Sequence, residues 1–279
     1  MSIQWFPGHM AKARKEMSEK LKAVDMVIEL RDARIPNASC NPLLESISVS
    51  KPRLVILTKK DKADPQETAK WLKHLNEKNI TLAFDLNKDK LINPITSACL
   101  EVMREKHEKM RSKGINPRAI RAMVVGIPNV GKSTLINRLA KRKVAQTANK
   151  PGVTRALKLI VVNETLQLID TPGVLWPKFD DQITGMYLAL TGAINDEAIL
   201  IDDVLTFGLE RLIESYPEKL IERYDIKVTL DSHQVLESIA KNRGYITTKG
   251  LDLKRTIDSI LKDIRNDQLG PLTWELYHE

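Results

Sequence analysis

Residues 126–133 read Gly-Ile-Pro-Asn-Val-Gly-Lys-Ser, a glycine followed by four residues and then by Gly-Lys-Ser. The stretch directly follows an apolar run, Ala122 to Val125, and it opens a helical pattern that extends from Ser133 to Leu139. A strand, a glycine-containing loop and a helix in this order form a phosphate-binding loop, because backbone N–H groups and the helix N-terminus point at the phosphate oxygens. The sequence therefore predicts that a nucleotide binds at this loop.

Individual residues of the loop have separate predicted roles. Lys132 is expected to reach the β- and γ-phosphates and to take part in catalysis, and the hydroxyl of Ser133 is expected to bind Mg²⁺. Thr134 adds a contact one residue further into the helix. The remaining nucleotide-binding positions of the loop are Asn129, Val130 and Gly131.

Two further motifs complete the expected Mg²⁺ site. Asp170-Thr-Pro-Gly173 follows the apolar run Leu166 to Ile169, and an aspartate at such a strand end is placed to hold Mg²⁺ directly or through water. The N–H of Gly173 is expected to meet the γ-phosphate, so that loss of this phosphate releases the loop. Thr154, in the stretch Pro-Gly-Val-Thr-Arg that begins at residue 151, is predicted to complete the Mg²⁺ shell and to act in catalysis.

A base-reading motif, Thr58-Lys59-Lys60-Asp61, ends the apolar run Leu54 to Leu57. The carboxylate of Asp61 accepts hydrogen bonds from guanine N1–H and the 2-amino group, whereas adenine offers neither donor; the stem of Lys59 packs on the base. GTPases normally have asparagine at the position of Thr58, where it mostly braces neighbouring loops. We therefore expect Thr58 to weaken binding without changing the base preference, and GTP, GDP and Mg²⁺ are the expected ligands.

A second base-contacting loop is predicted at Asp85-Leu86-Asn87, with Leu86 and Asn87 as the binding positions. This stretch follows the apolar run Ile80 to Phe84, so it lies at a strand end like the first base motif. The alternative, Ile95-Thr96-Ser97-Ala98, contains the usual Ser-Ala pair. No strand precedes it, however, and Pro94 is typical of the start of a helix.

Six apolar runs predict a sheet whose strands are buried on both faces, because they are rich in Val, Ile and Leu and lack strict alternation. Helical patterns between most of them indicate a doubly wound α/β fold. The predicted strands are Val24 to Leu30, Leu54 to Leu57, Ile80 to Phe84, Ala122 to Val125, Leu157 to Val162 and Leu166 to Ile169. The predicted helices are Met10 to Leu21, Pro65 to Asn76, Leu91 to Lys113 and Ser133 to Leu139.

The pattern changes after Pro177. Helical periodicity covers residues 183–194, 198–215, 217–224, 232–242 and 253–267, and no strand is expected there. We predict one domain over residues 1–177 and a small all-α domain over residues 178–279. Ordinary GTPases begin with the phosphate loop, whereas here the base motif comes first. The first domain is therefore predicted to be a circularly permuted P-loop GTPase domain with a six-stranded, mostly parallel sheet.

Charge is distributed unevenly along the chain. Residues 1–177 hold 32 Lys and Arg against 17 Asp and Glu, and residues 178–279 hold 12 against 19. Between Glu108 and Glu164 there is no acidic residue but 13 Lys or Arg, which indicates a polyanionic partner, most simply nucleic acid. Cys40 and Cys99 are expected to be reduced thiols. Without an apolar run of membrane-spanning length or a signal-type N-terminus, the sequence predicts a cytoplasmic protein with no membrane partner.

Taken with their order, these motifs resemble the circularly permuted ribosome-assembly GTPases of the YlqF/RbgA type. Besides the nucleotide motifs, the resemblance rests on Trp5-Phe6-Pro7-Gly8-His9-Met10, Asp32-Ala33-Arg34-Ile35-Pro36, Asp170 to Pro177 and Gly192-Ala193-Ile194. It implies a bacterial cytosolic factor that binds the large ribosomal subunit and acts late in its maturation. Contact with rRNA is expected, and the acidic helical domain is expected to bind either rRNA, through local basic faces, or ribosomal protein. A monomer is expected.

The residue that orients the attacking water is not found at its usual place. Val174 and Leu175 follow the Asp170–Gly173 motif, where many GTPases have glutamine. His9 is the candidate, with an imidazole that accepts a hydrogen bond from water; its alternative role is RNA contact or structure. Asn129 is expected either to help bind K⁺ beside the phosphates or to brace the loop.

Basic residues are predicted to contact rRNA around the Thr154 stretch. They are Lys141, Arg142, Lys143, Lys150 and Arg155, with Arg118 and Arg121 as a second group. Three rival functions remain: a small-molecule P-loop kinase, a switch acting on a protein partner, and an RNA-binding module with an inactive nucleotide site. ATP preference would favour the first, the acid-free stretch disfavours the second, and the full set of phosphate and Mg²⁺ groups disfavours the third.

Overall fold

The computed structural model describes residues 18–141, 159–169, 181–194 and 200–278 of the chain. Within them, the sheet has the order β3-β2-β1-β4-β6-β5, and all neighbours run parallel except β5, which is antiparallel to β6. All six predicted strands are therefore confirmed, with small shifts of their ends. Their bounds are Met26–Asp32 (β1), Arg53–Thr58 (β2), Thr81–Ala83 (β3), Ile120–Gly126 (β4), Leu159–Val161 (β5) and Leu166–Ile169 (β6).

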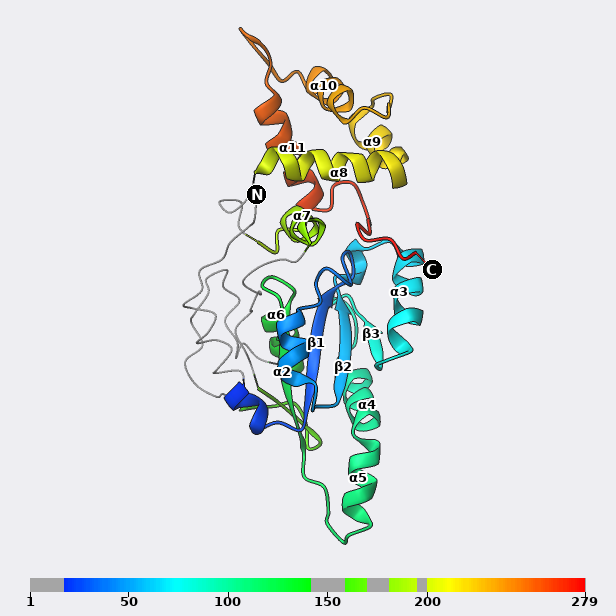
Figure 1. Ribbon diagram of the computed structural model, residues 1–279, viewed down its shortest axis with the longest axis vertical. Coiled ribbons are helices and arrows are strands. Elements are labelled where there is room, and N and C mark those ends of the chain that lie inside the picture. Colours follow the sequence, from blue (N-terminus) through cyan, green and yellow to red (C-terminus); the bar gives the residue numbers. More distant parts are fainter. Residues whose placement is uncertain (1–17, 142–158, 170–180, 195–199, 279) are drawn as a thin grey trace.

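The register of the three central strands brings the nucleotide motifs to one edge of the sheet. Strand β1 lies between β2 and β4, and Leu30 is paired with Ile56 on one side and with Gly126 on the other. Because the three strands are parallel, the base motif after β2 and the phosphate loop after β4 open at the same carboxyl edge. Figure 1 shows this edge facing the helical part of the molecule. Ligands of open α/β sheets bind in this position, where the strand order reverses.

Helices cover both faces of the sheet. Alternate residues of β1, namely Met26, Ile28 and Leu30, share a hydrophobic cluster with α4 and α6, whereas Val27 packs on the opposite face with Leu44 of α2. This two-sided burial explains the unbroken apolar composition of the strands. The helices of this part are Pro42–Ser48 (α2), Pro65–Asn76 (α3), Ile92–Val102 (α4), Arg104–Arg111 (α5) and Lys132–Leu139 (α6).

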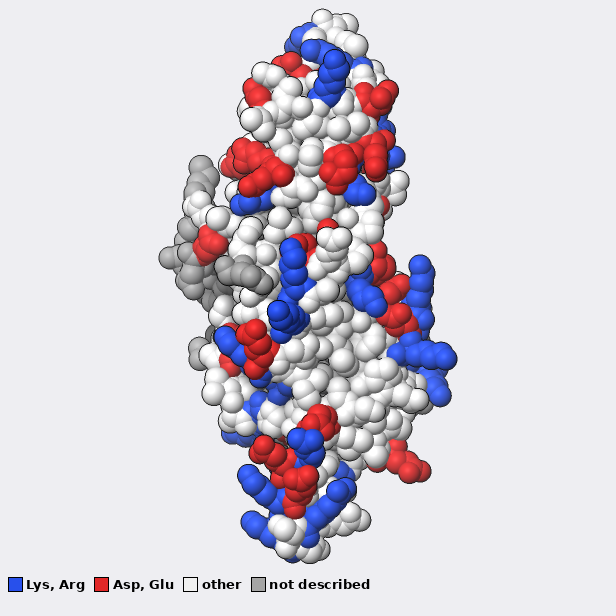
Figure 2. Space-filling model, turned by 90° about the vertical axis from the view of Figure 1, so that its right-hand side faces the viewer, with Lys and Arg blue, Asp and Glu red and all other residues white. Residues whose placement is uncertain are grey.

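The helix predicted from Leu91 to Lys113 is in fact two helices, α4 and α5. The break falls at Met103, whose backbone leaves the helical region (φ −94°, ψ 1°) while its side chain remains buried. The apolar face ends there, because α5 has no buried residue and reads Arg-Glu-Lys-His-Glu-Lys-Met-Arg. Helix α5 therefore projects from the body of the molecule (Figure 1). Figure 2 shows basic and acidic side chains mixed at this narrow end.

The part after residue 181 is a helical bundle built around its longest helix, α8. The predicted helices are confirmed with shifted ends, but the expectation that no strand follows Pro177 was wrong. Residues Ile246–Thr247 (β7) and Gly250–Leu251 (β8) form a two-stranded hairpin, too short to give a periodic pattern. The helices are Gln182–Leu190 (α7), Ile201–Ser215 (α8), Pro217–Tyr224 (α9), Ser232–Asn242 (α10) and Leu253–Arg265 (α11).

The segment after α11 returns to the sheet part and packs beside α3 (Figure 1). Trp274 N–H donates to the carbonyl of Arg34 over 2.8 Å, and the indole N–H of Trp71 donates to the carbonyl of Glu275 over 2.8 Å. The ring of Tyr277 meets that of Trp71 edge-on at 5.3 Å. Nothing in the sequence pattern predicted this return. Among the helices that the structure describes, none is long and apolar enough to cross a membrane.

Candidate nucleotide site

The loop between β4 and α6 has the backbone geometry of a phosphate cradle. Gly126, Asn129 and Gly131 have φ values of 154°, 58° and 106°, a succession that turns backbone N–H groups inward. A Cβ on Gly126 would stand 2.7 Å from the carbonyl oxygen of Leu30, and one on Gly131 would stand 2.9 Å from Leu86 Cδ1. Both glycines are thus required by space and by backbone conformation, and the cradle fits phosphate groups.

Lys132, the first residue of α6, has a buried ammonium group inside this loop. It donates to the carbonyl oxygens of Ile127 over 2.7 Å and Gly126 over 3.1 Å. The charge therefore sits inside the loop, and its contact with the β- and γ-phosphates stays a prediction. Ser133 and Thr134 follow in the first turn of α6, and both are half-buried. The position of Ser133 is compatible with its hydroxyl binding Mg²⁺.

Thr58 links the base motif to the phosphate loop. Its side chain is fully buried, and its hydroxyl donates to the carbonyl of Val130 over 2.7 Å while lying 3.1 Å from that of Arg31. The hydroxyl thus makes the bracing contact expected of this position, and its predicted part in nucleotide binding is indirect. Asp61, by contrast, is exposed in the 3₁₀ turn Lys60–Lys62, where its carboxylate is accessible to a base.

Lys59 is held by Asp32, an acidic residue to which the sequence pattern assigned no role of its own. Its ammonium donates to Asp32 Oδ2 over 2.8 Å, and the guanidinium of Arg34 binds the same carboxylate over 2.9 and 3.0 Å. Burial by itself raises the pKa of Asp32, but the charges of Arg34 and Lys59 outweigh it and hold that pKa well below the usual carboxyl range. A signal was present in the sequence, since Asp32 lies two residues after the apolar run that ends at Leu30.

The second predicted base loop lies against the phosphate loop. Leu86 is buried beside Gly131, and the exposed Asn87 follows β3 with its carbonyl accepting a hydrogen bond from Arg138 of α6. The rejected stretch, residues 95–98, lies inside α4, which agrees with that rejection. Arg138, counted among the basic residues of the acid-free stretch, also donates to the carbonyl of Asp89 over 2.9 Å. Its charge therefore braces the site.

Asn129 connects the phosphate loop to the helical part. Its side-chain amide donates to the carbonyl of Gly192, just after α7, over 3.1 Å. This bond supports the loop-bracing role. Four predicted site residues lie outside the described residues: His9, Thr154, Asp170 and Gly173. Within the part of the chain that the structure describes, no group of three His, Cys, Asp or Glu side chains could hold a metal ion.

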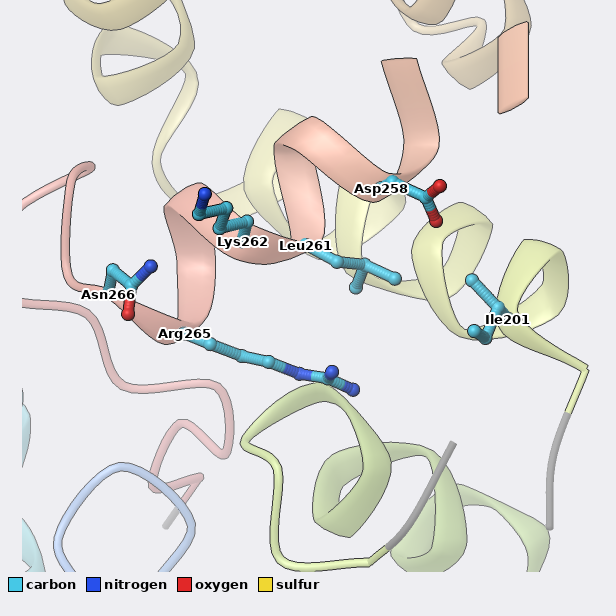
Figure 3. A pocket seen from close by; sticks show the side chains of 6 residues that line it. All are labelled: Ile201, Asp258, Leu261, Lys262, Arg265 and Asn266. Atoms are coloured by element: carbon cyan, nitrogen blue, oxygen red, sulfur yellow. The ribbon is translucent and has the colours of Figure 1, made fainter. Parts of the chain in front are cut away.

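A cavity of about 290 Å³ lies elsewhere, between the start of α8 and the end of α11. Figure 3 shows Arg265 and Leu261 extending from α11 toward Ile201, whereas Lys262, which also lines the cavity, points the other way. Arg265 spans to the carbonyl of Ala189 over 2.8 Å, so this charge is engaged within the helical part. The cavity shares no lining residue with the phosphate loop or the base motif.

Over most of its length the chain is similar to ribosome-associated GTPases. The family described as "50S ribosome-binding GTPase" matches residues 121–236. The ribosome biogenesis GTPase A of Bacillus licheniformis is 49% identical over 278 residues, covering 99% of this chain and 98% of the relative. The mitochondrial ribosome-associated GTPase 1 of Ictalurus punctatus is 40% identical over 262 residues, covering 86% and 78%. The structure of YlqF from T. maritima has a TM-score of 0.63 at 22% identity, with 95% and 98% covered, and supports the fold.

Proposed function

Since the chain belongs to the ribosome biogenesis GTPase A family, we propose that it hydrolyses GTP while bound to the large ribosomal subunit, during late assembly of that subunit. One observation supports the nucleotide part above others: Thr58 ties the base motif to the phosphate loop at the shared carboxyl edge of β2 and β4. This hydrogen bond joins the base-reading part of a guanine nucleotide site to its phosphate-binding part. The protein acts as a monomer in the cytoplasm.

The chemistry follows from the side chains around the cradle. Lys132 neutralises charge on the β- and γ-phosphates, and Ser133 provides a hydroxyl to Mg²⁺. Thr154 and Asp170 complete the metal site, and the N–H of Gly173 responds to the γ-phosphate. Bound Mg²⁺ stabilises the charge that develops on the phosphate oxygens as the γ-phosphoryl group leaves.

Guanine is selected by Asp61 and the stem of Lys59, while Leu86 and Asn87 close the other side of the base. An adenine there leaves the Asp61 carboxylate without its two donors, which costs about 1–3 kcal/mol or more for a group shielded from water. Discrimination against ATP therefore depends on Asp61.

Hydrolysis needs a group that orients water. We assign this role to His9, brought to the γ-phosphate when the protein binds the subunit. If His9→Ala retains full subunit-stimulated turnover, the assignment is wrong. Asn129 would help to hold a potassium ion that, when bound, would add positive charge beside the phosphates, and equal rates in K⁺ and Na⁺ would exclude this role.

The rRNA surface includes the basic residues on both sides of Thr154, of which Lys141 belongs to the described part. The decisive experiment measures phosphate release from GTP and from ATP, with and without purified large subunits. We expect GTP turnover alone to rise strongly when subunits are added. Slow GTP turnover without stimulation would remove the ribosomal partner, and a preference for ATP would overturn the base-reading assignment and favour a kinase.

A further inference from the structure

Lys59 reads a base only if its stem lies in one defined position. The residue is in the left-handed region (φ 57°), which aims its side chain back over β1, and its ammonium reaches Asp32 at the end of that strand. A lysine side chain has four rotatable bonds, so an unanchored Lys59 would lose conformational entropy each time a nucleotide binds. The ion pair with Asp32 holds the Lys59 side chain in place before a nucleotide binds.

The carboxylate of Asp32 is itself fixed from several directions. It is 2% exposed, and the guanidinium Nε and Nη2 of Arg34 bind its two oxygens in a bidentate pair. The backbone N–H of Arg34 adds a third bond over 3.0 Å, and the hydroxyl of Ser39 accepts from Asp32 N–H over 2.9 Å. A carboxylate held this firmly serves as a stationary anchor for an ammonium group.

Arg34 extends the anchor into the helical part. Its Nη2 lies 3.5 Å from the carbonyl of Thr191 after α7, and its Nη1 lies 3.8 Å from Asp267 after α11. Its own carbonyl accepts the N–H of Trp274 in the returning segment. The contacts to Thr191 and Asp267 reach the guanidinium from segments far apart in the chain, and the contact to Trp274 holds the backbone of Arg34.

We propose that Asp32 and Arg34 are positioning residues for guanine recognition. They hold the Lys59 side chain in the position that contacts the base, and this position depends on the contacts of Arg34 with the helical part. The inference rests on the proposed function, because it takes Lys59 and Asp61 as the base-reading pair. It extends that function by giving the first strand of the chain a role in nucleotide affinity, although this strand bears neither the phosphate loop nor the base motif.

The test is a double-mutant cycle on the full-length chain with fluorescent GDP. Asp32→Asn keeps the shape of the side chain but removes its charge, and Lys59→Met removes the ammonium. We expect each single variant to bind GDP about tenfold more weakly, the loss of one charge-assisted contact. Because Asp32 acts through Lys59, the double variant should bind no more weakly than Lys59→Met. Additive losses would overturn the proposal.

The matched control, Glu29, lies three positions before Asp32 on the same strand. Glu29 is as buried as Asp32 and forms its own ion pairs with Arg31 at 2.9 Å and Arg53 at 2.7 Å, without contact to Lys59. Glu29→Gln should lower the melting temperature but leave GDP affinity unchanged. If it weakens GDP binding as much as Asp32→Asn does, the effect is general destabilisation and the proposal fails.

Turnover separates positioning from catalysis. With Asp32→Asn, KM for GTP should rise about tenfold while kcat at saturating GTP stays unchanged, because the reacting phosphates are not touched. A fall in kcat with constant KM would contradict the proposal. Lys59→Arg keeps the charge opposite Asp32 and should restore most of the affinity lost in Lys59→Met, and this partly exposed position remains informative if Asp32→Asn does not fold.

Failure of the inference is distinguishable from failure of the proposed function. If Asp61→Asn loses guanine affinity while Asp32→Asn and Lys59→Met bind GDP normally, the base motif stands and the positioning role is wrong. If Asp61→Asn also binds GDP normally, the base-reading assignment itself is wrong.

Discussion

At the scale of single residues, the hydroxyl of Thr58 makes a bracing hydrogen bond at a position where GTPases usually have the amide of an asparagine. Thr58 is shorter than the asparagine usual at this position, yet its buried hydroxyl reaches the carbonyl of Val130. The contact is possible because β2 runs on to Thr58, so that this residue stands within the sheet beside Asp32 of β1. A strand that extends to the motif thus compensates for a shorter side chain.

Thr58→Ala removes the hydrogen bond between the Thr58 hydroxyl and the carbonyl of Val130, which connects β2 to the phosphate loop. We expect a loss of about 1–1.5 kcal/mol, hence GDP binding weakened five- to tenfold, as is typical when one buried hydrogen bond is lost. The ratio of GTP to ATP affinity should stay constant, because Thr58 does not touch the base. Titration with fluorescent nucleotides measures both. A changed ratio would show that Thr58 takes part in base selection.

The thiols give a pH-dependent prediction. Burial raises the pKa of Cys99 to about 12, and burial also raises the pKa of Cys40 above its ordinary value. At pH 8 only about one Cys99 in ten thousand is then a thiolate, the reactive form. Native protein should react very slowly with a thiol reagent at pH 8, with a rate that increases as the pH rises toward 12. Protein in urea should show two reactive thiols immediately. Fast labelling of native protein at pH 8 would contradict the burial.

At the scale of elements, the junction of β4 and α6 depends on conformations that only glycine adopts without strain. The close approach of Gly131 to Leu86 joins the phosphate loop to the second base loop, and the approach of Gly126 to Leu30 joins it to β1. The cradle is therefore formed by packing between loops as well as by its own backbone.

Gly131→Ala should weaken GDP binding about tenfold or more, because a Cβ there is strained at φ 106° by about 1–2 kcal/mol and also displaces Leu86. Gly114→Ala is the control. Gly114 also has a positive φ (74°), but it lies in open space between α5 and β4. This variant should lose some stability and bind GDP normally. Equal binding losses in both variants would attribute the effect to backbone strain alone.

The same elements show what sequence predicts well. Apolar runs such as Val24 to Leu30 predicted all six strands, and the glycine pattern predicted the loop between β4 and α6 at its observed place. The break at Met103 was missed, because polar helical residues continue the periodicity after the core has ended. The contacts of Asp32 with Lys59 and of Thr58 with Val130 join residues 27 and 72 positions apart, which periodicity does not connect. The nucleotide and metal roles of all the site residues stay predictions, and His9, Thr154, Asp170 and Gly173 also lie outside the described residues.

At the scale of the whole molecule, sheet and helical bundle share one hydrophobic cluster. It runs from Leu30 through Leu190 of α7 to Leu205 of α8, and the segment around Trp274 returns to α3. A division at residue 177 stays a prediction, and any such boundary is bridged by extensive contact. The phosphate loop and the helical part are in direct contact, as the hydrogen bond between Asn129 and Gly192 shows.

Trp274→Ala tests the strength of this connection. The indole is 3% exposed, and truncating a buried aromatic side chain costs about 3–5 kcal/mol. We expect the free energy of unfolding in urea to fall by this amount. Leu230→Ala, at a leucine that is 95% exposed, should change it by less than about 0.5 kcal/mol. A Trp274→Ala variant as stable as the parent would mean that the returning segment contributes little.

The position of β1 in the sheet has a consequence for synthesis on the ribosome. All seven of its residues are buried between β2 and β4, but β4 is translated long after β1, β2 and β3. Until β4 emerges, the growing chain presents an apolar strand with an open hydrogen-bonding edge, the feature that promotes pairing with other chains. Nascent chains halted before Ile120 should therefore aggregate or recruit chaperones, and those extended past Gly126 should not.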